Sequence, residues 1–306
     1  MRKFILKRIG YAVISLFLLS LTIFFFVRIT GDPTTLLVEP GASRDDIEAL
    51  RAQLGLDRPL LIQYVSFTTS LLRGDFGRSF YYRTPVTELY LSRLPNSLFL
   101  AATAMLFSLV IGIPSGILAA VRVNGFWDRG GKVFALLGLS MPQFWVGLLM
   151  ILFFSVYLGW LPSSGSGTPL HVLMPAFALG WYFAAAHMRM TRSSMLEVLG
   201  SEYVKLARLK GLPEALVIGK HAFKNALIPV LTLAGINLMT MVNVAVVVET
   251  VFAWPGVGRL LFEGIAFRDF PIVQATVILG GAMIVVVNLV IDVLYAWIDP
   301  RIRFER

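Results

Sequence analysis

The chain has 306 residues, of which 57% are hydrophobic and 15% are charged, and its mean hydropathy is +0.76. Soluble domains carry about 45–50% apolar and about 25% charged residues, so this composition excludes a disordered or collagen-like chain and argues against a soluble enzyme. The formal charge is +9, and the absence of cysteine excludes disulfides, thiolate metal sites and cysteine nucleophiles.

Five charge-free stretches predict six membrane-spanning helices, because about 20 apolar residues cross a bilayer. The third stretch is long enough for two spans, and the Pro- and Gly-rich segment 161–169 divides it. The chain is therefore expected to be an all-α polytopic membrane protein. The stretches are 9–27, 94–121, 133–188, 225–248 and 270–291.

The basic residues gather on one face of the predicted bundle. By the positive-inside rule that face is cytoplasmic, and six spans then place both chain ends there. This bias accounts for most of the +9 charge, so we expect no nucleic-acid partner. The basic residues that define this face are Arg2, Lys3, Lys7, Arg8, Arg122, Arg129, Lys132, Arg189, Arg192, Lys205, Arg208, Lys210, Lys220, Lys224, Arg301, Arg303 and Arg306.

The chain divides into three regions. Residues 1–30 form the N-terminal tail and a retained first span, since no small-residue cleavage site follows the apolar run. Residues 31–95 form a small helical insert outside the membrane, between the first and second spans. Ser43 with Asp46 predicts one helix start, and Thr84 before Pro85 predicts another. The insert either caps the translocation path or docks an external partner, and residues 96–306 form a five-helix core.

The cytoplasmic segment 201–213 predicts a short amphipathic helix, a sharp turn and a second short helix. Gly211 suits the left-handed C-terminal position of the first helix, and Pro213 prevents its continuation. The apolar side chains of Tyr203, Leu206 and Leu212 need a partner. That partner is either the ends of the chain's own helices or another subunit.

Motifs for catalysis or metal binding are missing from the sequence. His171, His187 and His221 are far apart, and each is expected at a helix end or helix interface. Residues 129–133 do not satisfy the phosphate-loop pattern, because the first glycine is missing and Val133 replaces the Mg²⁺-binding hydroxyl. We therefore expect a non-catalytic chain without a cofactor or a metal site.

Polar residues near membrane depth are candidates for the translocation path or its gate. An acid within a span is costly and marks a functional site by default, which selects Glu249 and Asp292. Asn243 joins them as a path candidate. Interhelical hydrogen bonding is the competing interpretation for all three, and also for Asn237 and Asn288. Pro114, Pro142 and Pro175 are candidates for kinks.

Several motifs together resemble a known family. Residues 202–212 and 221–229 are similar to the cytoplasmic "EAA" loop of permease subunits in ABC importers, in the B-type version of the oligopeptide/dipeptide/nickel family. Leu209 stands where that family usually has a small residue. The similarity extends over nearly the whole chain through segments 74–80, 158–162, 247–259, 268–271, 292–295 and 299–303.

The resemblance implies a type I ABC importer transmembrane fold in the bacterial cytoplasmic (inner) membrane. It also implies four kinds of partner: membrane lipid, a second homologous permease subunit, two cytoplasmic ATPases that bind ATP and Mg, and an external solute-binding protein. Whether the two ATPases are identical stays open. The EAA loop, at about 193–224, would couple to the ATPases. Its coupling residues would be Glu202, Tyr203, Leu206, Ala207, Arg208, Lys210, Gly211 and Leu212.

The function that the resemblance implies is an importer permease subunit for peptides or similar small solutes. Nickel or metal-chelate cargo is the alternative within the same role. Two alternatives come from other classes. One is a stand-alone ion-coupled secondary transporter with Glu249 or Asp292 as its proton site, and the other is a membrane-embedded enzyme, against which the lack of any acid and histidine cluster argues.

Overall fold

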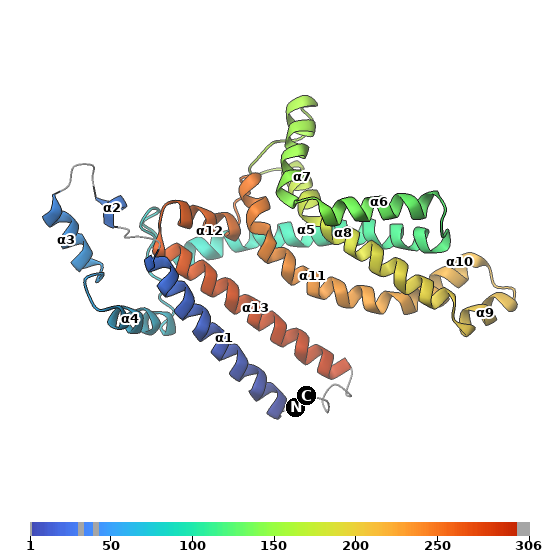
Figure 1. Ribbon diagram of the computed structural model, residues 1–306, viewed down its shortest axis with the longest axis horizontal. Helices are drawn as coiled ribbons and strands as arrows, with labels where there is room; N and C mark the ends of the chain where they lie inside the picture. The colour runs from blue at the N-terminus through green and yellow to red at the C-terminus, as the bar shows by residue number, and fades with distance from the viewer. Residues whose placement is uncertain (1, 30–33, 39–42, 299–306) are drawn as a thin grey trace. The chain divides into compact units, whose positions relative to one another are not determined.

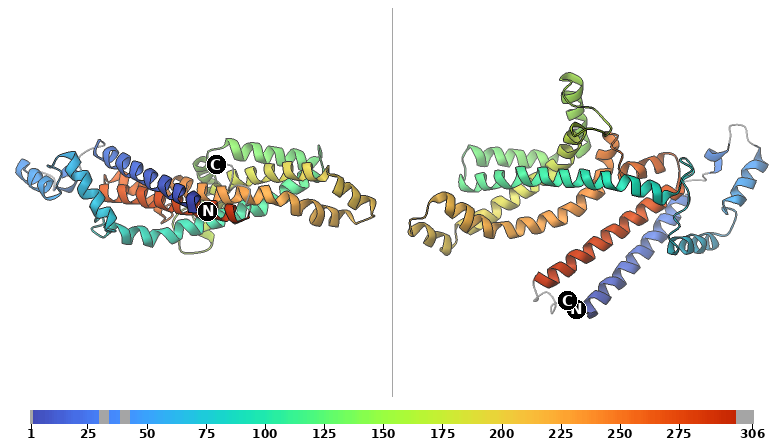
Figure 2. Two further views of the ribbon diagram at one scale, coloured as in Figure 1. Left: turned by 90° about the horizontal axis from the view of Figure 1, so that it is seen from below. Right: turned by 180° about the vertical axis from the view of Figure 1, so that it is seen from behind.

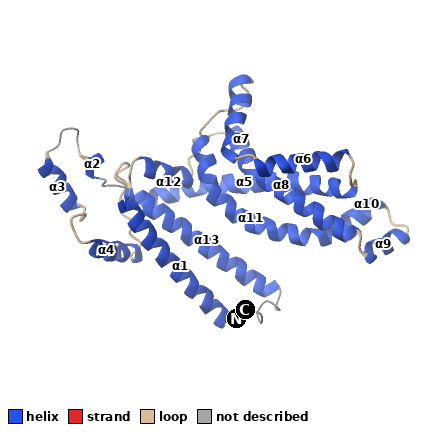
Figure 3. Ribbon diagram, in the orientation of Figure 1, coloured by secondary structure: helices blue, strands red, loops and turns tan. Residues whose placement is uncertain are grey.

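The computed structural model describes residues 2–29, 34–38 and 43–298, and their regular structure is helical (Figure 3). One isolated bridge pairs Arg78 with Pro85 in this part of the chain. The expected cytoplasmic residues Arg301, Arg303 and Arg306 lie outside the described residues. Asp292 lies in a described helix, but its side chain is outside the description.

The chain forms two compact units, Met1–Leu94 with Leu260–Arg306, and Pro95–Arg259. In the first unit, α1 (Arg2–Ile29) and α13 (Phe270–Ile298) lie side by side in every view (Figures 1 and 2). Ile23 and Val27 of α1 pack against Phe270 and Val273 of α13 in a buried apolar cluster. The first predicted span therefore pairs with the last one.

In the described part of the insert three helices precede α5, namely α2 (Thr34–Leu37), α3 (Arg44–Gln53) and α4 (Leu60–Leu72). The predicted start at Ser43 is confirmed, because Ser43 and Asp46 form a reciprocal capping box. The helix start predicted at Thr84 and Pro85 is confirmed, because α5 begins at Val86, although the buried Thr84 hydroxyl has no hydrogen-bond partner in the described residues and so does not cap the helix. Two hydrogen bonds join the described parts of α4 and α1, namely Ser20 with Tyr64 (3.0 Å) and Arg28 with Gln63 (2.8 Å).

Asp269 fastens the end of the insert to α13. Its carboxylate caps the helix by accepting from the Ile272 amide, and it accepts from the Ser79 hydroxyl at 2.6 Å and the Tyr81 amide at 2.9 Å. Nearby, Tyr82 donates to the Glu263 carboxylate at 2.7 Å. Partial burial and this acceptor raise the pKa of Tyr82 to about 12, so the phenol stays protonated at neutral pH.

The second unit is organised around α8 (Leu170–Leu199), which packs against α6 (Phe126–Ser140), α7 (Gln143–Met150) and α11 (Lys224–Val251) (Figure 1). About half of the α8 residues are buried, and the rest of the unit assembles on them. Helix α5 (Val86–Val121) contributes its part from Pro95 onward. A π-helical segment, η1 (Ile151–Tyr157), continues α7.

Two glycines bring α5 close to α8. A Cβ atom at Gly112 would lie 2.7 Å from the carbonyl oxygen of Ala184, and one at Gly116 would lie 2.6 Å from that of Met188. The pair is spaced as in the small-xxx-small pattern, which lets membrane helices approach backbone to backbone. Glycine is required at both positions because any side chain would clash with the backbone of α8.

Four helices are long and apolar enough to cross a membrane, or five if the bent pair α6–α7 is one span, within the described residues. The pair is bent by 106° at Met141–Pro142, which confirms the expected break at Pro142. Pro114 and Pro175 lie inside continuous helices. The remaining expected span, the fourth in chain order, coincides with α8, whose histidines and aromatic residues dilute its apolar character. The count of six stays a prediction.

His187 lies at a helix interface, as expected. Its ring is fully buried and bridges Ser108 of α5 (3.2 Å from Nδ1) and Asn237 of α11 (3.2 Å from Nε2). The Asn237 amide donates to Nε2, which places the ring proton on Nδ1, facing Ser108. This arrangement confirms Asn237 as an interhelical hydrogen-bonding residue and uses both nitrogens of the imidazole.

Candidate functional site

The helix–turn–helix segment is attached to the core by one face of α9 (Glu202–Leu209). Val204 is fully buried and Ala207 nearly so, and both pack in a cluster with Met195 of α8 and Ala226 of α11. These two positions are three residues apart, so they lie on one side of the helix. The inner face of α9 is therefore fixed to both long helices at whose ends it sits (Figure 1).

The turn after α9 depends on Gly211. Its φ is +74°, in the left-handed region, and its amide donates to the Arg208 carbonyl at 2.9 Å. A residue with a Cβ pays a steric penalty there, which explains why glycine serves as the helix stop. After Pro213, α10 (Glu214–Leu216) leads through a π-helical segment, η2 (Val217–Phe223), into α11.

The outer face of α9 is apolar and exposed. Tyr203 is 45% exposed, Leu206 is 52% exposed and Leu209 is 84% exposed. Polar side chains surround them: Lys205 pairs with Glu202 at 2.8 Å. We call Tyr203, Leu206 and Leu209 the outer apolar face, which is an unusual composition for a helix that lies beyond the membrane spans.

Arg208 holds the two arms of the turn together. Its guanidinium makes a two-pronged contact with Glu214, at 2.8 Å and 3.2 Å, across the Gly211 turn. Hydrogen bonding to that carboxylate raises the pKa of Arg208 above its ordinary value. Both groups are largely exposed, so the pair orders the turn more than it stabilises the fold.

The structure divides the predicted coupling residues by position. Ala207 lies on the inner face, and Leu212 is half-buried against the same cluster as Val204. The remaining ones are exposed: Glu202, Tyr203, Leu206, Arg208, Lys210 and Gly211. Val204 and the Arg208 partner Glu214 were not singled out from sequence. The i, i+3 spacing of Val204 and Ala207 could have identified Val204. The pairing of Glu214 with Arg208 across a turn has no local sequence pattern.

Glu249 forms a buried junction at the end of α11. Its carboxylate accepts from the Ser97 hydroxyl at 2.6 Å and from the Arg259 amide at 3.1 Å, at the start of α12 (Val257–Ala266). The Ser97 oxygen in turn accepts from the Val257 amide at 2.8 Å. The acid thus satisfies helix-terminal amides that would otherwise lack partners.

The other two path candidates have different surroundings. Asn243 is exposed on α11, six residues before the buried Glu249. Asp292 belongs to the last helix, α13, in the first unit. The structure thus describes Glu249 and Asn243 in one unit and Asp292, without its side chain, in the other.

Comparisons with known proteins point to one family. The model described as "Binding-protein-dependent transport system inner membrane component" matches residues 112–304, and "Binding-prot-dependent transport system membrane comp, N-term" matches residues 1–101. Proteins named "Glutathione transport system permease protein GsiC" are 40% identical in Escherichia coli K12 and 41% identical in Salmonella typhi. Each alignment covers 306 residues, the whole of both chains.

Solved structures with a similar fold are transporters. A chain of the inward-facing MetNI methionine ABC transporter aligns with a TM-score of 0.59 and 20% identity, over 70% of this chain and 97% of that one. A chain of an amino acid ABC transporter crystallised with histidines aligns with a TM-score of 0.52 and 16% identity, over 68% and 93%. At these identities the likeness concerns the fold alone.

Proposed function

The chain belongs to the family of binding-protein-dependent transport system inner membrane components and is a permease subunit of an ABC importer, and on that basis we propose that its helix–turn–helix segment couples to separate ATPases. The observation that carries this proposal is the outer apolar face of α9. Exposed apolar side chains within a polar rim are typical of a protein–protein contact.

Force applied to α9 has a direct route into the membrane helices. The inner face of α9 packs on α8 and α11 through Val204 and Ala207, and packed interiors transmit displacement because they do not compress. Closure of the ATPases moves the segment, and the segment tilts the two helices around the translocation path. In this mechanism the apolar side chains of Tyr203, Leu206 and Leu212 contact the ATPase. Glu202, Arg208 and Lys210 form the polar rim of the contact, and Ala207 packs the segment onto the core.

The proposed assembly follows from the same role. The chain pairs with a second homologous permease subunit, two cytoplasmic ATPases supply ATP and Mg binding, and an external solute-binding protein delivers the cargo. The basic loops and both termini face the cytoplasm, in keeping with the positive-inside pattern. The coupling residues then lie on the side of the membrane where ATP is available.

The proposed cargo is a peptide or a similar small solute. The support is full-length similarity to permeases named for glutathione transport, since glutathione is a peptide. Binding of peptides by the cognate solute-binding protein, measured by calorimetry after co-purification, is the expected result. Tight binding of nickel complexes without peptide binding would replace the peptide by a metal-chelate cargo.

For the path itself we propose Asn243 and Asp292 as polar positions, and a gate-supporting role for Glu249. Both Glu249 carboxylate oxygens accept hydrogen bonds in the buried junction, which supports positioning of α12 rather than cycles of protonation. This argues against a stand-alone ion-coupled transporter. Uptake by the purified chain alone in liposomes under a pH gradient would reinstate that alternative.

The coupling proposal is tested by Leu206→Asp in the assembled importer. A carboxylate at the centre of the outer apolar face opposes burial in the contact, so we expect the ATPases to be lost on purification and solute-stimulated ATP turnover to fall at least tenfold, the equivalent of about 1.4 kcal/mol. Leu60→Asp is the matched control, since Leu60 is 51% exposed on α4 and far from α9 in sequence.

Retention of the ATPases by Leu60→Asp with loss in Leu206→Asp supports the proposal. Equal retention and equal stimulated turnover in both variants would contradict it. The yield of monodisperse chain checks membrane insertion in each variant. We expect a normal yield from Leu206→Asp, because Leu206 is exposed and its replacement leaves the core intact.

A further inference from the structure

A cluster of positive charge lies between α6 and α8, away from the coupling residues. Asp128 is fully buried and accepts from Arg192 at 2.7 Å and from Lys132 at 2.9 Å. Arg189 lies one helical turn before Arg192 and is joined to no carboxylate among the described residues. Three cations therefore share one acid, which leaves a local charge of +2.

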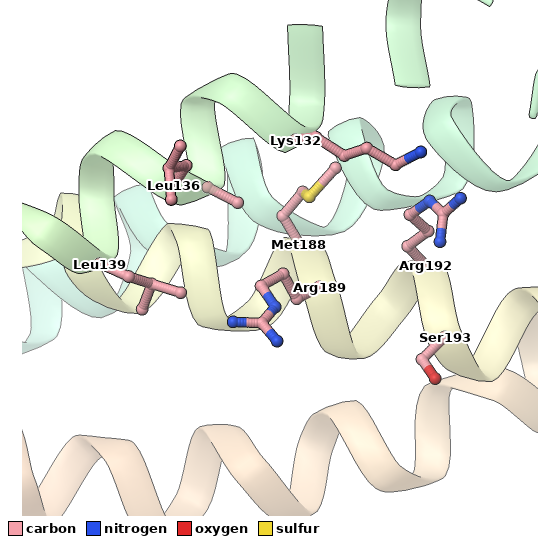
Figure 4. A pocket seen from close by; sticks show the side chains of 8 residues that line it. Lys132, Leu136, Leu139, Met188, Arg189, Arg192 and Ser193 are labelled. Carbon is pink, nitrogen blue, oxygen red and sulfur yellow. The ribbon is translucent and has the colours of Figure 1, made fainter. Parts of the chain in front are cut away.

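These cations line a cavity of about 540 Å³. Figure 4 shows the charged ends of Lys132 and Arg192 together at one end, with Leu136 and Leu139 of α6 towards the other. The Arg189 side chain extends from α8 below these residues, and its charged end points away from those of Lys132 and Arg192, towards the side of Leu139. The cavity thus has a cationic end and an apolar wall, which suits an anionic group attached to an apolar chain.

Exposed aromatic side chains stand at the start of α6, next to the cavity. Phe126 is 82% exposed and Trp127 about half exposed at the start of α6, and exposed aromatic residues gather at the membrane–water interface. Lys132 follows about 9 Å further along the helix axis, and Leu136, which is 66% exposed, about 15 Å further. Aromatic and cationic side chains therefore come first along α6, where they suit the headgroup level, and the apolar Leu136 follows at the level of the acyl chains.

We propose that this cavity binds the phosphate of an anionic phospholipid at Lys132 and Arg192, with the exposed Arg189 as a further cation for the acidic headgroup and an acyl chain along Leu136 and Leu139. Basic pockets between membrane helices on the cytoplasmic side bind acidic headgroups in this way. Asp128 is a positioning residue, because it aims Arg192 and Lys132 at the cavity without neutralising all three cations. The exposed Leu136 and the half-buried Leu139 favour a lipid over a free anion, since an inorganic anion gains nothing from an apolar wall.

The test measures lipid binding to the purified, delipidated full chain by native mass spectrometry. We expect one tightly retained phosphatidylglycerol and weaker retention of phosphatidylcholine. Arg189→Gln should weaken phosphatidylglycerol binding about fivefold, the contribution of one cation at a membrane surface. Arg189 is the residue of choice because it is exposed and takes no part in the Asp128 ion pairs. Arg129→Gln is the matched control, an exposed arginine on α6 that does not line the cavity.

Competition assigns the ligand. Inorganic phosphate at millimolar concentration should leave the lipid bound. If phosphate displaces it, the cavity is a small-anion site, and if glutathione displaces it, the cavity belongs to the cargo; either result overturns the proposal. Equal binding of the two lipids, or equal affinity in Arg189→Gln and Arg129→Gln, overturns it as well. None of these outcomes bears on ATPase coupling, which is measured separately at Leu206.

Discussion

Three buried carboxylates carry much of the polar structure of this chain, and each acts at a helix terminus or between helices. Asp128 joins α6 to α8, Glu249 holds the start of α12, and Asp269 caps α13 and fastens the insert. Burying an ionised group is costly unless its hydrogen bonds are satisfied, so each acid recruits several donors. At the residue scale these three carboxylates stabilise helix ends and helix contacts, and that role is testable.

Glu249→Gln should destabilise the protein rather than merely abolish a proton site. A glutamine has one acceptor oxygen, so either the Ser97 hydroxyl or the Arg259 amide loses its acceptor. Hydrogen bonds to charged groups contribute about 1.5–3 kcal/mol, which lowers the apparent melting temperature by about 5 °C. Thermal unfolding of the purified chain measures this shift.

Glu197→Gln is the control for that measurement, because Glu197 is exposed on α8 in the same unit. Its melting temperature should match that of the unmodified chain. Unchanged stability of Glu249→Gln combined with complete loss of uptake would assign Glu249 to proton or cargo handling instead.

At the scale of elements, the α9 turn is where sequence and structure agree in detail. Gly211 adopts the left-handed conformation expected of it, and α9 ends within two residues of the predicted stop. The agreement is possible because helix capping and turn geometry depend on neighbouring residues. The same local logic predicted the Ser43 capping box and the break at Pro142.

Hydrogen bonds between residues far apart in the chain could not be predicted from the sequence, and the reason is also physical. Ser97 and Glu249 are 152 residues apart, and Ser79 and Asp269 are 190 apart. Such contacts depend on how whole helices pack, and no sequence periodicity around either residue of a pair indicates its partner. The helix start at Thr84 and Pro85 was predicted, but the capping contact was not: the Val86 amide donates to the Gly77 carbonyl, a contact from outside the local motif.

Gly211→Ala tests the turn directly. A Cβ at φ +74° costs about 1 kcal/mol, so we expect the apparent affinity of the permease for its ATPases to fall about fivefold. Gly211→Asn should stay within about twofold of the native chain, since asparagine tolerates the left-handed region. The measurement is ATPase binding to the reconstituted permease.

Gly219→Ala is the control for the turn, because Gly219 lies in η2 with open space around its Cα and no positive φ. Its affinity should equal that of the native chain. If Gly211→Ala and Gly219→Ala behave alike, the left-handed turn is not what positions the outer apolar face.

At the scale of the whole molecule, the open question is whether the bent α6–α7 pair crosses the membrane. Four helices qualify as spans on their own, and a 106° bend is compatible with either a broken span or a re-entrant loop. If the pair crosses the membrane, the positive-inside rule places Arg122 on the cytoplasmic side and the neutral loop around Ser166 on the opposite side. Topology is therefore the one prediction on which orientation, coupling and the lipid cavity all depend.

The absence of native cysteine makes this prediction simple to test. A single cysteine at Ser166 should react with a membrane-impermeant maleimide in intact spheroplasts, whereas one at Arg122 or Lys210 should react only after permeabilisation. Arg122 and Ser166 flank the bent pair, so labelling from opposite sides means that the pair crosses. Labelling of both from the same side would make it re-entrant, reduce the six spans to five, and place the N- and C-termini on opposite sides of the membrane.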